Sequence, residues 1–259
     1  MRGALALVAL VCSLAFAGVA AGAENPVVGA MERSATADSA VVKIAAVNRL
    51  RGGGSFVMTG TGRLRGQQIA MTVRLRGSGL DTRMELIGLR EPSGYAMYVR
   101  SPLFGSQLPP GKTWLRVDLA KGGRELGIDF DALLDVSEST LPVRRGLVSS
   151  RLLGRETVAG RSARHYRVVV DLERVAAVVP AYRRQLRALE RATGVDLGRQ
   201  SQDVWVGADG RLARLRYTSP AVNGAVTTQT LTYAAYGVPV DITTPPAKSI
   251  FDPSTAPPA

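Results

Sequence analysis

Strict alternation of apolar and polar residues, in segments separated by very short turns, constrains the fold of this chain more than any other feature. The clearest segment is 69–76, in which every second residue is apolar and the others are small or polar. Period two indicates a half-buried β-strand. The same alternation recurs in 95–100, 115–119 and 166–171, which we therefore predict to be strands.

Glycine-rich turn signals separate these segments, at 52–54, 66–67, 77–79 and 91–94. Because the short spacing leaves no room for crossover helices, the strands must form an antiparallel meander. Later in the chain we predict a hairpin and two more strands, followed by prolines that end regular structure: 203–206 with 212–217, then 226–236, 238–243, Pro245 and Pro246. The total is about ten strands.

The tetrapeptide Arg-Leu-Arg-Gly occurs three times, at 49–52, 63–66 and 74–77, in a chain of formal net charge +12. A nucleic-acid surface is one reading. In a meander, however, each copy is a strand end: leucine continues the apolar face, the arginines point to the other face and glycine permits the turn. Successive turns lie at opposite edges, so the copies do not form one basic stripe. With 5% aromatic residues for base stacking, we expect no nucleic-acid partner.

Helical patterns are fewer. We expect a short helix at 27–35 and two helical insertions, at 129–135 and from Leu141 to about Leu153. The acids of 129–135 also suit a calcium loop, but Leu133 occupies a ligand position and the sixth-position glycine and closing glutamate are missing. Acidic residues at a helix N-terminus explain this stretch better.

The longest helical pattern is 173–193. Its apolar side carries Val175, Val178, Val179, Tyr182, Leu186 and Leu189, and its basic side Arg183, Arg184, Arg187 and Arg191. Pro180 should kink this helix or start its second half. We expect the apolar stripe to pack across the concave side of the sheet. The basic side suits either ordinary solvation or transient contact with an anionic membrane surface.

The N-terminus predicts export. Residues 1–23 combine a basic start, a stretch of 21 uncharged residues and Ala21-Gly22-Ala23, so we expect a signal peptide cleaved before Glu24. An uncleaved membrane anchor is the alternative. Cys12 follows Leu10-Val11, which are larger than the residues that precede a lipidated cysteine. We predict a secreted or cell-envelope protein.

The exported chain would have 236 residues and no cysteine, because Cys12 is removed with residues 1–23. Neither disulfides nor thiolate metal sites can support it. A chain of this length can bury roughly 70% or more of its unfolded surface in one domain. We therefore expect one domain over 24–252, a disordered tail at 253–259 and a monomer.

Catalytic and cofactor motifs are scarce. His165 reads as a surface strand residue, and Asp171 lies six residues along the same strand, roughly 20 Å away at about 3.3 Å per residue. No Gly-x-Ser-x-Gly elbow occurs, and the glycines of 60–66 miss the dinucleotide fingerprint. Glu85 and Glu91 stay open as glycosidase-like acids. We predict no enzyme, metal or cofactor.

Four stretches carry a resemblance in their order and spacing: 110–118, 154–172, 203–212 and 236–242. Together they span most of 30–252, and they are similar to the LppX/LprG group of actinobacterial envelope lipoproteins, which have the LolA-like fold. The resemblance implies a curved antiparallel half-barrel, an α+β fold with helices on its concave face and an apolar cavity that accepts acyl chains. The chain departs from the group because it lacks the lipidation cysteine.

The residues themselves are compatible with such a cavity. An inward-facing set on the strands includes three methionines, which adapt to variable chains, and the long helix adds an apolar stripe. The predicted ligand-binding residues are Ile69, Met71, Val73, Leu75, Met84, Leu86, Met97, Val99, Val179, Tyr182 and Leu186. The same residues would also suit a closed, filled core.

Two classes of function follow. The first is an exported carrier of a lipid or another lipophilic molecule. The second is a ligand-free envelope interaction or sensor module, comparable to RseB-type regulators that use a similar fold. A hydrolase is a distant third.

Overall fold

The computed structural model describes residues 25–254, apart from 106, 120, 123–144 and 220–224. Its longer helices are α2 (Pro26–Ala35), α7 (Leu172–Val178) and α8 (Pro180–Thr193), with short 3-10 turns η2 (Pro102–Phe104) and η3 (Ala247–Ser249). The strands are β1 (Ser39–Arg49), β2 (Ser55–Arg65), β3 (Gln68–Gly77), β4 (Leu80–Glu91), β5 (Gly94–Arg100), β6 (Trp114–Asp118), β7 (Leu147–Val158), β8 (Arg161–Asp171), β9 (Arg199–Gly207), β10 (Leu212–Thr218), β11 (Val226–Tyr236) and β12 (Ile250–Phe251).

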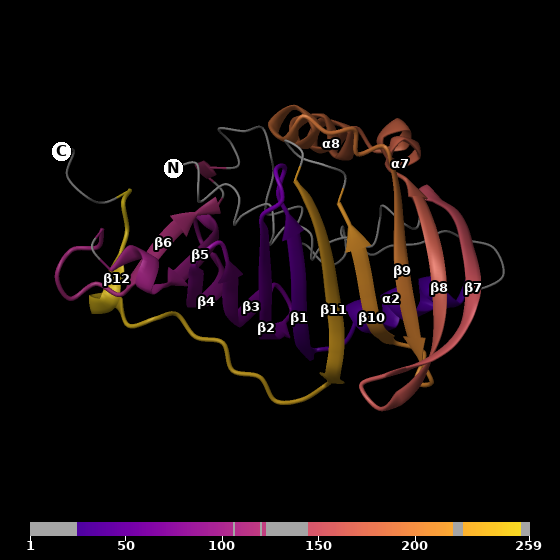
Figure 1. The fold of residues 1–259 in the computed structure, drawn as a ribbon, viewed down its shortest axis with the longest axis horizontal. Coiled ribbons are helices and arrows are strands. Elements are labelled where there is room, and N and C mark those ends of the chain that lie inside the picture. The colour runs from indigo at the N-terminus through magenta and orange to yellow at the C-terminus, as the bar shows by residue number, and fades with distance from the viewer. Residues whose placement is uncertain (1–24, 106, 120, 123–144, 220–224, 255–259) are drawn as a thin grey trace. The chain divides into compact units, whose positions relative to one another are not determined.

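The described strands number twelve, and their order is β12-β6-β5-β4-β3-β2-β1-β11-β10-β9-β8-β7 (Figure 1). The β-strand meander is antiparallel, whereas β12 pairs in parallel with β6. The predicted α+β class with an antiparallel sheet is confirmed, but about ten strands was too few. Curvature into a half-barrel and helices on a concave face stay predictions.

Backbone contacts divide the chain into two compact units. Unit 1 comprises residues 1–36 and 126–215, and unit 2 comprises residues 37–125 and 216–259. Unit 2 contains the meander β1–β6 with β11 and β12, and unit 1 contains α2, α7, α8 and β7–β9. The prediction of one domain over 24–252 stays a prediction.

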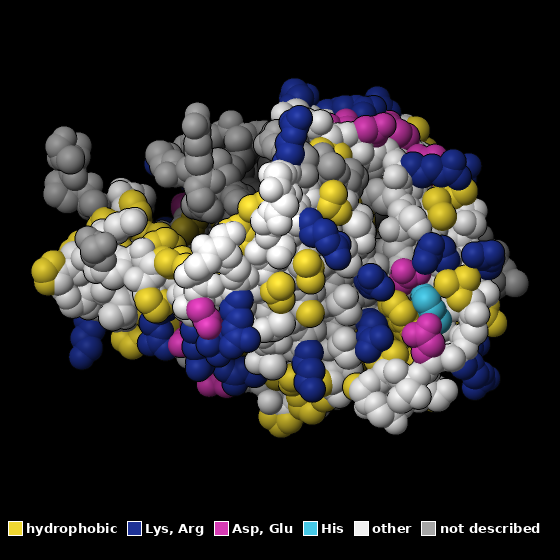
Figure 2. Space-filling view, in the orientation of Figure 1, with side chains coloured by type: hydrophobic (Ala, Val, Ile, Leu, Met, Phe, Trp, Pro, Cys, Tyr) yellow, Lys and Arg dark blue, Asp and Glu magenta, His cyan; other side chains and the backbone are white. Residues whose placement is uncertain are grey.

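The three Arg-Leu-Arg-Gly copies lie at strand ends, as predicted, but β1 ends at Arg49, so Leu50 is exposed beyond the strand and does not continue the apolar face. Gly52 and Gly66 have positive φ in the turns after β1 and β2, and Gly77 has it at the end of β3. A Cβ on Gly77 would lie 2.1 Å from the carbonyl oxygen of Ser55, so the first and third copies are at the same edge. In the third copy both arginines are paired locally: Arg74 and Arg76 contact Asp81 at 2.6 and 3.4 Å. Figure 2 shows basic and acidic side chains mixed over these strands, which agrees with a solvated sheet face.

The predicted strand at 238–243 is wrong. This segment has no regular structure, yet Val240 and Ile242 are buried against Leu89, Ala96, Tyr98 and Trp114. Side chains satisfy its backbone, since Ser39 Oγ donates to Val238 O and Arg65 Nη1 donates to Val240 O at 3.4 Å. Every second side chain of this segment is buried or half-buried, which explains the period-two pattern, although the backbone does not pair with a strand. Regular structure also continues after Pro245 and Pro246, in η3 and β12.

The predicted helix from Leu141 to about Leu153 is wrong from Leu147 onward, and of its described residues only Arg145 and Gly146 are helical. From Leu147 the backbone pairs with β8 as strand β7, with register shifts between Leu147 and Ser149 and between Leu152 and Gly154. Leu152 and Leu153 are 54% and 41% exposed at this sheet edge, so the apolar residues that suggested a helix do not form a buried stripe. The insertion at 129–135 and the tail from 255 lie outside the described residues.

Helix α2 occupies the predicted position. Asn25 caps it by accepting a hydrogen bond from Val27 N at 3.1 Å, and Pro26 takes the first helical position. Val27, Ala30 and Met31 are buried. Ser34 Oγ accepts a hydrogen bond from Leu212 N at 2.8 Å, which joins the helix to β10 within unit 1. Among the described helices, none has the length and apolar character needed to span a bilayer.

Candidate ligand-binding face

The eight strand residues predicted to contact a ligand share one face of the unit 2 sheet. Residues paired across antiparallel strands point to the same side, so the register defines this apolar face in rows. Read from β11 toward β6, they are Leu231, Ile44, Gly60, Val73 and Met84; Tyr233, Val42, Gly62, Met71, Leu86, Val99 and Leu115; and Ala40, Leu64, Ile69, Gly88, Met97 and Val117. Leu75 lies one row further, between Met58 and Thr82.

Most of this apolar face is buried. Met71 is the most accessible of the seven fully buried predicted residues, at 7%, and Leu75 is half-buried. The predicted set lacks four buried members of the face on β1 and β11, namely Val42, Ile44, Ala46 and Leu231. The stretch 41–47 is apolar at almost every position, so apolar and polar residues do not alternate clearly. The sequence therefore does not predict which of its side chains face the core.

Methionines are concentrated here. Four of the six in the chain, Met58, Met71, Met84 and Met97, lie on the apolar face. Met58 was not among the predicted residues, although its half-buried side chain belongs to the row of Leu75. The unbranched, polarisable methionine side chain adapts its shape to what it contacts, so this face can repack at modest cost.

Two glycines fix how closely the apolar side chains approach the sheet. A Cβ on Gly62 would lie 3.0 Å from Val42 Cγ2 and 3.2 Å from Met71 Cγ. At Gly88, a Cβ would lie 2.5 Å from Tyr95 Oη and 2.7 Å from Ile69 Cγ2. Because Gly62 and Gly88 have no side chain, these neighbouring side chains pack directly against the glycine backbone.

The helical part of the predicted site lies in unit 1. Leu186 is buried and Tyr182 is half-buried on α8, where burial raises the pKa of the Tyr182 hydroxyl. Val179 is half-buried and joins α7 to α8 with extended rather than helical angles. Pro180 therefore starts a second helix, which was one of the two outcomes predicted. A place for these three residues beside the strand residues stays a prediction.

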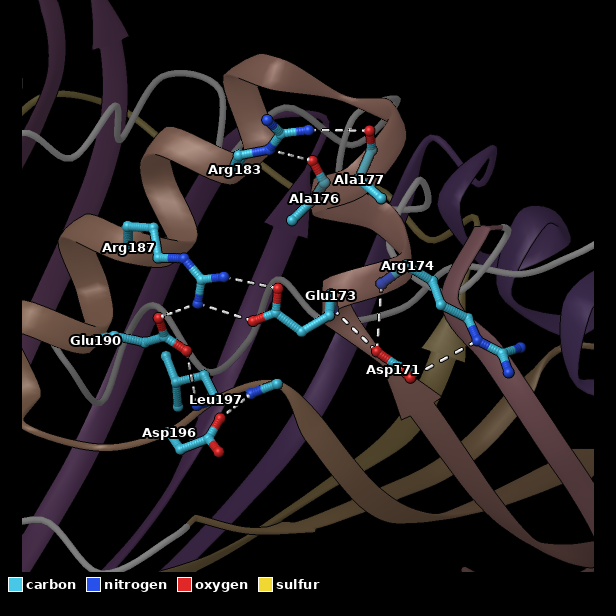
Figure 3. Close-up of polar contacts among 11 residues, drawn as sticks. Asp171, Glu173, Arg174, Ala176, Ala177, Arg183, Arg187, Glu190, Asp196 and Leu197 are labelled. Carbon is cyan, nitrogen blue, oxygen red and sulfur yellow. Dashed lines mark hydrogen bonds and ion pairs between the residues drawn. The ribbon is translucent and has the colours of Figure 1, made fainter.

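Arginines that were predicted to be a basic surface hold the two helices together (Figure 3). Arg183 Nε donates to Ala176 O at 2.7 Å and its Nη2 to Ala177 O at 3.0 Å, which caps the C-terminal end of α7. Arg187 donates to both carboxylate oxygens of Glu173 at 2.8 Å. Two of the four arginines are thus engaged within unit 1, which reduces the charge offered to a membrane. Contact with an anionic membrane stays a prediction.

His165 lies on strand β8, as predicted, but it is half-buried and paired rather than solvated. Its side chain is 13% exposed, and both ring nitrogens contact carboxylates, Nδ1 to Glu156 at 2.7 Å and Nε2 to Asp203 at 3.1 Å. The imidazole stacks on the Trp205 ring with centroids 4.1 Å apart. Arg167 Nε donates to the same Asp203 at 2.6 Å. Figure 2 shows the cyan histidine between acidic side chains.

Trp205 is the centre of this cluster on β7–β9. It is 4% exposed and packs with Val158 and Ala163, while its Nε1 donates to Glu156 Oε2 at 2.8 Å. That bond, helped by His165, holds the pKa of the Glu156 carboxyl below its usual value although burial opposes the shift. Each ring nitrogen of His165 thus faces a carboxylate and not a serine or cysteine side chain. Among the described residues, no group of three or more His, Cys, Asp or Glu is arranged to hold a metal.

The two glutamates left open as acids serve ion pairs. Glu85 contacts Arg100 at 2.6 Å. Glu91 contacts Arg116 at 2.6 Å and accepts a hydrogen bond from Tyr98 Oη. Each of the two carboxylates thus has an arginine partner.

No family model and no curated protein matches the chain. Its fold is similar to those of several solved structures. LprF from Mycobacterium bovis is 14% identical, with 84% of this chain and 93% of that chain covered at a TM-score of 0.46. The lipoprotein LppX from Mycobacterium tuberculosis is 12% identical, with 83% and 94% covered at 0.46. A LolA superfamily protein from Nitrosomonas europaea is 12% identical, with 85% and 93% covered at 0.28.

LppX is one of the two proteins that name the group which the sequence resembles.

Proposed function

We propose that this protein is an exported carrier of the cell envelope, without catalytic activity, that holds acyl chains or another lipophilic ligand against the apolar face of unit 2. One observation carries the proposal: six neighbouring strands, β11 and β1–β5, turn mostly apolar side chains to the same side. Transfer from water to such a face stabilises a bound chain by about 25 cal/mol per Å² of apolar area buried.

The composition of the face supports a ligand that varies in shape. Met58, Met71, Met84 and Met97 supply flexible contacts spread over four successive strands. A core selected only for stability favours branched residues with well-defined rotamers, because flexible methionines specify a packing poorly. Export rests on residues 1–23, which lie outside the described part of the chain.

The first test is the lipid content of the purified protein. We expect mass spectrometry under native conditions to detect an acyl lipid at close to one molecule per chain, retained through repeated purification. The protein should also take up a fluorescent fatty acid after delipidation. Absence of both, in repeated preparations, would contradict the carrier and leave the ligand-free interaction or sensor module as the function.

A second test places the ligand on the face. We expect Met71→Trp and Val73→Trp to weaken lipid uptake by roughly tenfold, which corresponds to about 1.4 kcal/mol, because each indole would occupy ligand space. Thr61→Trp is the matched control, since Thr61 is exposed and lies on the opposite side of β2, next to Gly62. Circular dichroism should report an intact fold in all three variants. Unchanged uptake in both buried variants would remove these positions from the site.

A further inference from the structure

Two amide side chains interrupt the apolar face at one end. Gln229 on β11 pairs with Ala46 of β1, and Asn48 follows two residues later on β1, opposite Thr227. Both side chains therefore point to the same side as Ile44 and Leu231. Gln229 is 6% exposed, and its Oε1 has no hydrogen-bond partner within the described chain. The Oδ1 of Asn48 is likewise buried without one.

A buried carbonyl oxygen without a donor is costly. Folded proteins satisfy the great majority of such atoms, and each exception costs about 1–3 kcal/mol in lost solvation. Here two exceptions are diagonal neighbours on adjacent strands, so their side chains are within reach of a single small group. An apolar residue at either position would avoid the cost, which makes a ligand that supplies the missing donors the physical explanation we favour.

The surroundings define the chemistry of that group. On β11, β1 and β2 the neighbours of Gln229 and Asn48 on this side of the sheet are uncharged, namely Thr227, Ala46, Phe56, Met58 and Leu231. Amide oxygens accept hydrogen bonds and do not donate them. A hydroxyl or amide N–H fits both oxygens, whereas a phosphate or carboxylate would place its own acceptors against these oxygens, with no cation among these five neighbours to balance its charge.

We propose that Gln229 and Asn48 form a polar subsite that binds the neutral, hydroxyl- or amide-bearing headgroup of an acylated ligand. The inference rests on the proposed carrier function. The acyl chain would then run from this end across Ile44 and Val73 toward Met97. The six residue steps of β1 from Ala46 to Ala40 span roughly 20 Å at about 3.3 Å per step, a length that accommodates a long chain.

The test compares two probes that share one acyl chain: a monoacylglycerol, which carries hydroxyls, and the fatty acid methyl ester, which has no donor. We expect the delipidated protein to bind the monoacylglycerol about 3- to 10-fold more tightly, the effect of one to two net hydrogen bonds. Gln229→Met and Asn48→Leu, which keep side-chain volume, should abolish this preference by weakening monoacylglycerol binding.

A second measurement does not depend on lipid. Because Gln229→Met removes an unsatisfied buried oxygen, it should raise the Tm of the ligand-free protein. The matched control is Gln202→Met: Gln202 is 7% exposed on β9, and its side-chain atoms are not among the buried atoms that lack partners. This control should lower the Tm and leave the probe preference intact.

The outcomes separate the subsite from the carrier. Equal binding of the two probes by the unmodified protein, or a preference that survives in both variants, would overturn the subsite while the carrier stands. A fall in Tm for Gln229→Met would show that Oε1 has a partner inside the chain and would also overturn the subsite. Failure to bind either probe would overturn the carrier, and the subsite with it.

Discussion

Trp205→Ala is expected to lower the free energy of unfolding by about 3–5 kcal/mol, the usual cost of truncating a buried aromatic residue. The indole is 4% exposed and packs with Val158 and Ala163. Its removal would also take away the stacked partner of His165 and the N–H donor of Glu156. The histidine and both carboxylates around it would then border a cavity, and so the loss should lie at the upper end of this range.

Urea unfolding followed by circular dichroism measures this change. Two further variants separate the contribution of the aromatic ring from that of the hydrogen bond to Glu156. Trp205→Phe keeps an aromatic ring against His165 and loses the donor, so it should cost about 1–2 kcal/mol. Glu156→Gln keeps an acceptor for the indole and removes the charge, and its cost should be smaller than that of Trp205→Ala. A loss below 1 kcal/mol for Trp205→Ala would show that the cluster is peripheral to stability.

The sequence predicted the meander because its strands alternate cleanly and its turns need glycine. In 69–76 one face is apolar and the other is solvated, so the pattern also gave the direction of each side chain, and eight predicted residues lie on one face. The same use of apolar periodicity gave wrong predictions for two segments in which the apolar pattern does not come from a strand with one buried face. β7 is an edge strand with exposed Leu152 and Leu153, and 238–243 alternates because it packs on β4–β6 without a ladder.

The cluster at His165 escaped prediction for a different reason. Its members come from three strands, and the register alone brings them together: His165 pairs with Gly154 across a bulge and with Trp205 on the other side. Sequence reasoning tested only Asp171, on the same strand. The sequence does place polar residues at positions that face the same side as His165, namely Glu156, Arg167 and Asp203. They were not brought together because the first part of β7, up to about Leu153, is predicted as a helix.

The sequence also could not predict that the side chains of Gln229 and Asn48 lie on the apolar face. Glutamine and asparagine in a strand read as solvated side chains, and nothing in 226–236 marks Gln229 as inward-facing, because threonines and tyrosine surround it. Their direction follows from pairing with Ala46 and Thr227. A polar group on an apolar face thus becomes informative only when the register is known.

Raising the pH from about 9 to about 12 is expected to unfold the protein in one cooperative transition. Burial raises the pKa of five tyrosine hydroxyls above the usual value of 10.0, and the pKa values of Tyr98, Tyr217 and Tyr233 rise to about 12. The other two are Tyr95 and Tyr182. At Tyr98 the hydrogen bond to Glu91 adds to the effect of burial.

The sign follows from proton binding. Between pH 10 and pH 12 the folded chain holds protons that the unfolded chain has released, so the free energy of unfolding falls as the pH rises. This stabilisation is fully present below pH 10 and is lost as the pH rises through 12. For Tyr98, which is 3% exposed, a shift of two pH units corresponds to about 2–3 kcal/mol. Several such groups together are comparable to the usual net stability of about 5–15 kcal/mol.

Two signals followed in one titration measure the transition: tyrosinate absorbance and far-ultraviolet circular dichroism. We expect them to change together, at a midpoint above pH 10, because the buried hydroxyls ionise only as the chain unfolds. Tyr98→Phe should move the midpoint to higher pH, since it removes one of the groups that drive the transition. Gradual tyrosinate formation centred near pH 10, with circular dichroism unchanged to pH 12, would show that these hydroxyls ionise in the folded protein.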